Sequence, residues 1–226
     1  MKSVCTVILA RLGSTRLPKK MIKKFGEKTI LDFILNRARN LDNWPNVILA
    51  TTDLDQDDEL EKIAKSHNID TYRGSVDDVA SRFIKAANKN NAKWINRVNG
   101  DNVFFDYEKI NYASKLIKTM PNIDIISNVN ENHIPGFSVE LICNDAITKA
   151  YEKMNLLQKE HVTKFFYDNI YKYNIHWLSN EEKLSALAID SIEDLNKALI
   201  LLNEPYSFTH STTILDISKS NALVKY

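Results

Sequence analysis

The chain has 226 residues, with 30 Lys and Arg against 29 Asp and Glu, so its formal net charge is +1. Balanced charge argues against a dedicated nucleic-acid-binding protein, and no apolar run reaches the roughly 18–20 residues that span a bilayer. The 44% hydrophobic and 26% charged content is typical of a globular protein. Two cysteines are too few for a disulfide framework, so we expect a cytoplasmic protein that binds neither nucleic acid nor a membrane.

Short apolar runs alternate with amphipathic patterns, which predicts alternating strands and helices. In chain order we expect a strand at 4–10, a helix at 30–38, a strand at 47–51, a helix at 57–67, an extended piece at 71–73, a helix from 76, a strand at 94–98, a helix at 107–118, strands at 123–127 and 137–143, helices at 144–154 and 159–171, a strand at 186–189 and a helix at 191–202. Ser75 is expected to cap the helix that begins near Val76, and Ser191 with Asp194 to form a capping box.

Strands that alternate with helices indicate an α/β fold with a mainly parallel sheet covered on both faces. No repeat, low-complexity tract or linker divides the sequence, so we expect residues 1–226 to form a single domain. Ligands of such sheets bind beyond the carboxyl ends of the strands. This rule selects four polar loops, at 11–20, 52–55, 99–102 and 190–191.

The first of these loops concentrates residues suited to phosphate. Gly13 lets backbone N–H groups approach a ligand, and the hydroxyls of Ser14 and Thr15 can donate hydrogen bonds. The cations of the loop are Arg11, Arg16, Lys19 and Lys20. The loop has neither the Walker spacing nor the dinucleotide-binding fingerprint. On composition it is either a phosphate-binding loop, which we favour, or a solvated basic turn.

Aspartates follow two other predicted strands. Asp101 comes directly after Asn99 and Gly100, and Asp190 follows the strand predicted at 186–189. Mg²⁺ is commonly bound by one or two carboxylates together with substrate phosphates. Each aspartate taken singly is more simply a turn or strand-end residue, because Asn, Gly and Asp are also favoured in turns.

Several segments along the chain form an ordered set. They are Ala10-Arg11-Leu12-Gly13-Ser14-Thr15-Arg16-Leu17-Pro18 with Lys20, Ala50-Thr51-Thr52-Asp53, Arg73-Gly74-Ser75-Val76-Asp77-Asp78-Val79, Arg97-Val98-Asn99-Gly100-Asp101, Val139-Glu140, Glu160-His161-Val162-Thr163 and Ile189-Asp190-Ser191-Ile192-Glu193-Asp194-Leu195. Together they resemble the cytidylyltransferase family, in particular the branch named for spore coat polysaccharide biosynthesis. That branch is related to the enzymes that make CMP-activated acidic sugars.

The resemblance implies a Rossmann-like three-layer nucleotidyltransferase fold with a small inserted segment. This segment, at about 128–180, would shape the acceptor pocket and a homodimer contact. The implied reaction transfers CMP from CTP to a small acceptor, a sugar or sugar acid, with release of pyrophosphate, for surface glycan biosynthesis. Mg²⁺ is the implied cofactor, and its implied ligands are Asp101 and Asp190.

The resemblance also implies roles for individual residues. The implied catalytic residues are Arg11, Arg16, Lys20 and Asp101. The implied nucleotide-binding residues are Leu12, Gly13, Ser14, Thr15, Arg73, Ser75, Asp78, Asn99 and Gly100. The implied acceptor-binding residues are Glu140, His161 and Thr163.

Departures from the family pattern bear on the acceptor. Val103 stands where the family usually has a proline, and Ser138 where the branch usually has an aspartate. No arginine follows Arg97, whereas relatives that use keto acid sugars hold the carboxylate with basic side chains of the second half. A carboxylate would depend here on main-chain amides or on Lys149, Lys159, Lys164 and His161. The lack of an arginine after Arg97 argues against a sialic-acid-like or octulosonate acceptor. Another sugar, a polyol phosphate or a phosphonate stays open as the acceptor.

Two other functions stay open at this point. A sugar-nucleotide-dependent glycosyltransferase would use Asp53-Leu54-Asp55 as its metal motif, although solvated surface is the favoured interpretation of these residues. A non-catalytic nucleotide-binding protein is compatible with Val103 and Ser138. The sequence does not distinguish CTP from UTP.

Overall fold

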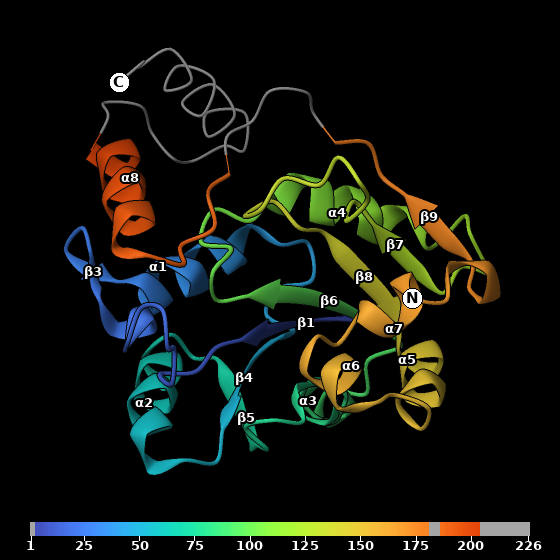
Figure 1. The fold of residues 1–226 in the computed structure, drawn as a ribbon, viewed down its shortest axis with the longest axis horizontal. Coiled ribbons are helices and arrows are strands. Elements are labelled where there is room, and N and C mark those ends of the chain that lie inside the picture. The colour runs from blue at the N-terminus through green and yellow to red at the C-terminus, as the bar shows by residue number, and fades with distance from the viewer. Residues whose placement is uncertain (1–2, 181–185, 204–226) are drawn as a thin grey trace.

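The computed structural model describes residues 3–180 and 186–203. It is built around a seven-stranded sheet in the order β5-β4-β1-β6-β8-β7-β9 (Figure 1). The strands are β1 (Val4–Leu9), β4 (Val47–Thr52), β5 (Asp70–Gly74), β6 (Trp94–Asn99), β7 (Ile125–Ser127), β8 (Glu140–Cys143) and β9 (Ile175–Trp177). Neighbours from β5 to β6 are parallel, as are β7 and β9, whereas β8 is antiparallel to β6 and β7. The predicted mainly parallel sheet is confirmed.

Helices cover both faces of this sheet. They are α1 (Ile30–Arg37), α2 (Asp58–Ser66), α3 (Val79–Lys89), α4 (Tyr107–Leu116), α5 (Asn144–Tyr151), α6 (Leu156–Glu160), α7 (Lys164–Tyr167) and α8 (Ile192–Asn203), with 3-10 turns η1 (Lys20–Ile22), η2 (Ala38–Asn40), η3 (Asp55–Asp57) and η4 (Ile170–Lys172). A separate hairpin pairs β2 (Lys24–Phe25) with β3 (Lys28–Thr29). None of the helices in the described part of the chain is long and apolar enough to cross a bilayer.

Alternate side chains of β1 enter two separate cores. Ile8 belongs to a core shared with α1, α2, α4 and α8, and Val7 to one shared with α3, α5 and α7. Successive side chains of a strand point to opposite faces, so a strand covered on both faces reads as a nearly continuous apolar run. Figure 1 shows α1 and α4 on one side of the sheet and α3 and α5 on the other.

The start of α3 differs from the prediction. Asp78, and not Ser75, is the N-cap, because its carboxylate accepts a hydrogen bond from Ser81 N (2.9 Å). Ser75 lies one turn earlier, where its hydroxyl accepts a bond from Asp78 N (3.1 Å). The helix therefore begins at Val79, three residues later than expected.

Two predictions for the second half are wrong. The single helix predicted over 159–171 is divided into α6, α7 and η4, because Val162 has a φ of 34° that no helix accommodates. The strand predicted at 186–189 is not a strand: its backbone donates from Leu187 N to Pro135 O (2.9 Å), which lies in a loop. The predicted capping box of α8 is confirmed, since Ser191 and Asp194 exchange side-chain-to-backbone bonds.

Candidate active site

The strands β1, β4 and β6 are neighbours in the sheet, and their carboxyl ends lie together at one end of it, which we call the carboxyl edge. Leu9, at the end of β1, is paired with Ala50 of β4 on one side and with Asn99 of β6 on the other. Three of the four predicted loops therefore meet at this edge, as the rule for open α/β sheets requires. The fourth loop joins them through a hydrogen bond from Ile189 N to Asp101 O (3.0 Å).

A buried carboxylate fastens the loop after β1 to the end of β4. Asp57 Oδ1 accepts from Leu12 N (2.8 Å), and Oδ2 accepts from Thr51 Oγ1 (3.0 Å) and Thr52 N (3.2 Å). The hydroxyl of Thr52 is a fourth donor. Asp57 is fully buried, so these charge-assisted bonds fix the loop firmly. Sequence reasoning missed this residue, because nothing in the spacing separates it from the other aspartates of the acidic run 53–58.

The tip of the same loop is open to solvent. Gly13 and Thr15 are exposed, and Ser14 Oγ accepts a hydrogen bond from Leu17 N (3.3 Å). Because Asp57 fixes the start of the loop and the tip is exposed, the polar groups of the tip are available to a ligand. Their contact with a nucleotide stays a prediction.

Two predicted cations of the loop lie against a predicted metal ligand from the other end of the chain. Asp190 Oδ1 is 3.0 Å from Arg16 Nη2 and 3.3 Å from Lys20 Nζ, and Lys20 Nζ also donates to Ile189 O (2.6 Å). The side chain of Lys20 is 11% exposed and that of Arg16 is 70% exposed. Lys20 is therefore a fixed part of the structure, whereas Arg16 can leave Asp190 at little cost.

The carboxylates of Asp101 and Asp190 suit a magnesium ion that also binds phosphate. Asp101 Oδ1 is buried and has no hydrogen-bond partner among the described residues. Its main chain is bonded to that of Ile189, next to Asp190. No group of three or more His, Cys, Asp or Glu that could hold a metal occurs in the described ranges. The pair fits Mg²⁺ because this ion often takes one or two carboxylates and completes its shell with substrate phosphates and water.

One glycine precedes Asp101, and another packs against the segment before Asp190. A Cβ on Gly100 would lie 2.7 Å from Met21 Sδ and 3.2 Å from Leu9 O. A Cβ on Gly136 would lie 2.6 Å from Ala188 N, and the φ of Gly136 is +99°. At Gly136 the close approach of two main chains leaves no room for a side chain, whereas at Gly100 the flexible end of Met21 and, slightly, Leu9 O would have to move.

Two arginines converge on the backbone before α3. Arg82 Nη1 donates to Ser75 O (2.6 Å), and Arg11 Nη1 donates to Val76 O (3.4 Å). Burial and, to a smaller extent, the charge of Arg11 together lower the pKa of Arg82 to about 10. Arg82 Nε is buried without a described partner. Sequence reasoning missed Arg82; the scarcity of arginine, seven in the whole chain, was a signal that could have found it.

The residues predicted for the nucleoside pocket already bond within the protein. Arg73 pairs with Asp58 and Glu61 of α2, and the bond to Asp58 raises its pKa. Asp78 caps α3 through one oxygen and accepts from Tyr151 OH (2.6 Å) through the other. The nucleotide contacts of Arg73, Ser75 and Asp78 stay predictions.

A cavity of about 290 Å³ brings together all three predicted acceptor-binding residues. This β6–β8 pocket is lined by Arg97, Val129, Ser138, Glu140, His161, Thr163, Lys164, Tyr167 and Asp168. Of the four basic side chains considered from sequence, His161 and Lys164 line it. Lys159 lies instead 3.8 Å from Asp78 Oδ2, and Lys149 is exposed on α5. Arg97, the last arginine of the chain, lines the pocket as well.

A network of hydrogen bonds lies at the base of the β6–β8 pocket. Glu140 is 1% exposed; it pairs with Arg97 and accepts a bond from Tyr167 OH (2.6 Å). Burial alone would raise the pKa of Glu140, but the charge of Arg97 and three hydrogen bonds hold it below its usual value. Burial and the neighbouring Glu140 raise the pKa of Tyr167 well above its usual value. The carboxylate is therefore charged and the phenol neutral.

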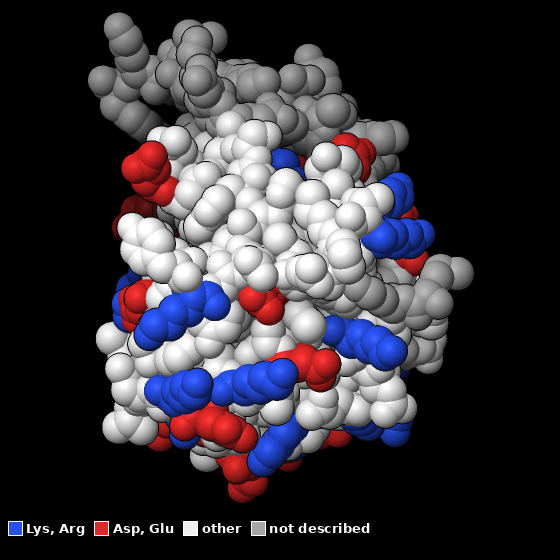
Figure 2. Space-filling model, turned by 90° about the vertical axis from the view of Figure 1, so that its right-hand side faces the viewer, with Lys and Arg blue, Asp and Glu red and all other residues white. Residues whose placement is uncertain are grey.

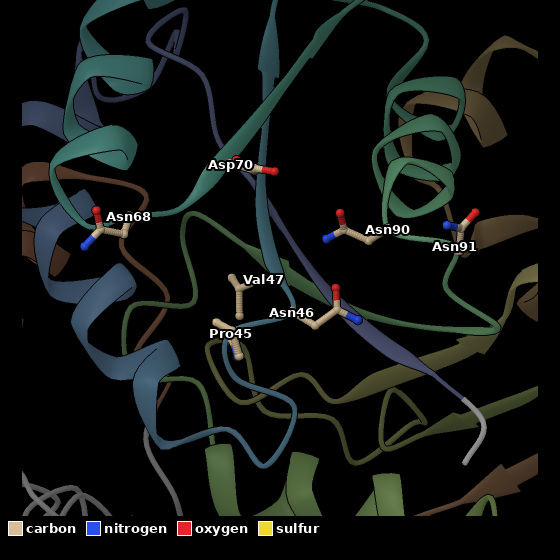
Figure 3. Close-up of a pocket in the computed structure, with 7 residues that line it drawn as sticks. All are labelled: Pro45, Asn46, Val47, Asn68, Asp70, Asn90 and Asn91. Carbon is tan, nitrogen blue, oxygen red and sulfur yellow. The ribbon is translucent and has the colours of Figure 1, made fainter.

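A larger cavity, of about 530 Å³, lies at the opposite edge of the sheet (Figure 3). It is lined by Pro45, Asn46, Val47, Asn68, Asp70, Asn90 and Asn91. Val47 and Asp70 are the first residues of β4 and β5, so this cavity faces the amino ends of the strands. Ligands of parallel sheets bind at the carboxyl ends, and the size of this cavity does not make it the active site.

Comparison with known proteins identifies the family. A family model described as Cytidylyltransferase matches residues 5–212. The chain therefore belongs to the cytidylyltransferase family and is a nucleotidyltransferase with the α/β fold of that class. The glycosyltransferase alternative is wrong, and Asp53 and Asp55, which it required, are exposed.

The chain is also similar to two curated relatives and to one solved structure. It is 28% identical to the spore coat polysaccharide biosynthesis protein SpsF of Bacillus subtilis, over 86% of this chain and 84% of that protein. It is 24% identical to a 3-deoxy-manno-octulosonate cytidylyltransferase of Francisella tularensis, over 90% and 87%. A cytidylyltransferase structure from Leptospira borgpetersenii matches with a TM-score of 0.93 and 28% identity, covering 98% of this chain and 96% of that one.

Proposed function

We propose that the protein transfers CMP from CTP to a sugar acid and releases pyrophosphate, as a step in surface glycan biosynthesis in the cytoplasm. The acceptor oxygen attacks the α-phosphorus, its proton is lost, and the bond from the α-phosphorus to the pyrophosphate oxygen breaks. One observation carries the proposal. Arg16, Lys20, Asp101 and Asp190 lie together at the carboxyl edge, although 170 residues separate Lys20 from Asp190.

The cations of the loop after β1 stabilise the triphosphate and the leaving pyrophosphate. Arg16 is exposed and can exchange Asp190 for a phosphate, whereas Lys20 is fixed and supplies a constant positive charge. Negative charge develops on the phosphoryl oxygens, so most of the catalysis comes from positioning and from these cations.

Asp101 and Asp190 would hold Mg²⁺, which when bound neutralises phosphate charge and makes the acceptor oxygen easier to deprotonate. The buried Oδ1 of Asp101, which has no described partner, supports this role. No side-chain nucleophile is required for direct transfer between the two substrates.

The acceptor class is supported by two independent observations. The relative from Francisella tularensis is named for the acceptor 3-deoxy-manno-octulosonate. The β6–β8 pocket is large enough for a sugar, and its lining offers hydroxyl and charged groups. It is lined by Glu140, His161 and Thr163, which the sequence assigns to the acceptor.

The decisive experiment measures pyrophosphate release with CTP, Mg²⁺ and a panel of sugar acids, sugar phosphates and a phosphonate. We expect Asp101→Asn to lower turnover by about 100-fold or more while CTP still binds, since a metal ligand is lost. Asp55→Asn is the matched control and should leave turnover unchanged, because Asp55 is exposed. CTP binding without pyrophosphate release for any acceptor would favour a non-catalytic protein, and absence of CTP binding would exclude the proposed reaction.

We also propose a homodimer formed through the segment 128–180. Large apolar side chains of this segment are exposed: Leu156 (86%), Leu157 (51%), Ile170 (42%), Tyr171 (97%) and Trp177 (41%). Figure 2, which views the molecule from the β9 side, shows a broad central area of uncharged residues, polar as well as apolar, with charged side chains below it. Exposed apolar area of this kind is typical of an interface. Sedimentation velocity over a range of concentrations tests the proposal.

A further inference from the structure

Arg97 belongs to the β6–β8 pocket because of the register of the sheet. On β6 it lies on the same face as Ile95, which packs in the core of α3, α5 and α7. The antiparallel pairing of Asn96 with Leu141 places Arg97 beside Glu140 at the next step. An arginine that precedes the whole acceptor half in sequence therefore supplies that half with a guanidinium.

The hydrogen-bond donors of Arg97 divide into a used and an unused set. Nη1 donates to the carboxylate of Glu140 and to Thr163 Oγ1 (3.4 Å). Nε is buried without a partner, and no described residue accepts a bond from Nη2. Nε and Nη2 form the side of the guanidinium whose two N–H bonds are parallel, and this fork matches the two oxygens of a carboxylate.

Glu140 holds this fork in place and, although it lines the pocket, exposes almost no surface to a ligand. It is almost fully buried and accepts bonds from Arg97 and from Tyr167, whose hydroxyl is 2.8 Å from Ser127 Oγ. A side chain held in this way has one orientation, so the unused fork has a fixed direction. Glu140 is thus a positioning residue, although the sequence assigns it to acceptor binding.

The charges of the pocket favour a single carboxylate over a phosphate. Arg97 is paired with Glu140, and Lys164 with Asp168 at 2.8 Å, so the pocket has little surplus of positive charge. A phosphate dianion would be repelled by the buried charge of Glu140. A carboxylate carries one charge and meets the fork geometrically, which a lysine could not reproduce.

We propose that Arg97 binds the carboxylate of the acceptor and selects an acid over its neutral counterpart, while Glu140 holds the guanidinium in place. This assignment rests on the proposed function, because it concerns the acceptor of that reaction. It makes Arg97 the specificity-determining residue of the β6–β8 pocket. It also predicts that a polyol phosphate is a poorer acceptor than a sugar acid.

Calorimetry with two matched probes tests the assignment. The first probe is 3-deoxy-manno-octulosonate, and the second is the same sugar with its carboxylate reduced to a hydroxymethyl group. We expect the protein to prefer the acid by about tenfold or more, and Arg97→Lys to lose most of that preference. The double variant Arg97→Gln with Glu140→Gln should bind both probes equally. Equal binding of the two probes by the unmodified protein, or binding of neither, would overturn the proposal.

Two controls separate specificity from folding. The double variant removes both charges together, so its melting temperature should stay close to that of the unmodified protein. Arg39→Lys, an exposed arginine near Trp44, should change neither probe affinity nor the affinity for CTP. All variants should bind CTP with unchanged affinity.

The same proteins distinguish this assignment from the proposed function. If CTP binds without pyrophosphate release from the acid, while the preference for the acid persists and falls in Arg97→Lys, the reaction is wrong and the role of Arg97 stands. If pyrophosphate is released and Arg97→Lys has an unchanged KM for the acceptor, the role of Arg97 is wrong and the reaction stands.

Discussion

The loop after β1 and the β6–β8 pocket are built in opposite ways. The loop carries four cations and two hydroxyls within residues 11–20, and most of its tip is exposed. The pocket draws its polar groups from β6, β8 and the segment before and within α7, and a buried ion pair lies at its base. The loop keeps positive charge available, whereas the pocket has already paired most of its charge.

This difference matches what each region has to recognise. A triphosphate carries several negative charges, and exposed cations near Asp190 can rearrange around it. A small acceptor has to be told apart from similar molecules, which calls for groups that are held still. In the pocket, the guanidinium of Arg97 has a fixed direction because it pairs with the buried Glu140. Removing one partner of such a buried pair destabilises the protein.

The largest predicted effect concerns that pair. Glu140→Ala leaves Arg97 buried without its partner, and Tyr167 loses its acceptor. We expect a loss of about 3–5 kcal/mol in the free energy of unfolding, because an uncompensated charge remains inside the protein. Urea denaturation followed by circular dichroism measures it. The double variant Arg97→Met with Glu140→Leu should recover most of the loss, and equal instability of single and double variants would contradict the explanation.

The pH dependence of stability gives a second view of the same pair. Arg97 holds the pKa of Glu140 below its usual value in the folded protein. The charge of Glu140 therefore contributes stability above the pKa of about 4.3 that a glutamate has in the unfolded chain. This contribution is lost as pH falls through the lower pKa of the folded protein. The difference in stability from Glu140→Gln should accordingly be constant above about pH 5 and shrink in acid. A difference that grew in acid would have the wrong sign.

An intermediate effect is expected in the loop after β1. Asp57→Asn keeps the shape of the side chain but turns one acceptor oxygen into a donor, facing either Leu12 N or the donors of β4. We expect a loss of about 1–3 kcal/mol, the usual cost of a buried polar group left unsatisfied. The KM for CTP should also rise, because the base of the loop is released. Thermal unfolding and steady-state kinetics measure both, with Asp55→Asn as the exposed control.

The two regions also differ in how far the sequence predicts them. The loop is local, so a strand end followed by glycine, hydroxyls and cations already indicates phosphate. Its support at Asp57 is also close in sequence but lies in an acidic run that looks uniform. The pocket depends on the antiparallel pairing of β6 with β8, and no local pattern reveals that Arg97 faces residues 40 to 70 positions later.

The predicted elements are wrong where tertiary contacts, and not the local sequence pattern, determine the backbone conformation. The segment 186–189 is apolar enough for a strand, but its hydrogen-bond partners are the loops at Pro135 and Asp101. β9 was not predicted at all, because three residues of an edge strand give too short a pattern. By contrast, the buried run of β1 and the capping box at Ser191 depend on neighbours in sequence and were predicted.

The smallest predicted effect concerns Arg82, which lies beneath the loop and shares its charge environment with Arg11. Arg82→Lys keeps the positive charge, but its single ammonium nitrogen cannot occupy the place of Nη1 on Ser75 O and the place of the unpartnered Nε at the same time. We expect the KM for CTP to rise by about 3- to 10-fold, a change of about 1 kcal/mol, while the KM for the acceptor is unchanged. The buried Arg82 and the half-buried Arg11 repel each other in the free protein, and a bound phosphate relieves this repulsion. Arg39→Lys is the matched control, and a fall in melting temperature with an unchanged KM for CTP would mean that Arg82 serves the fold alone.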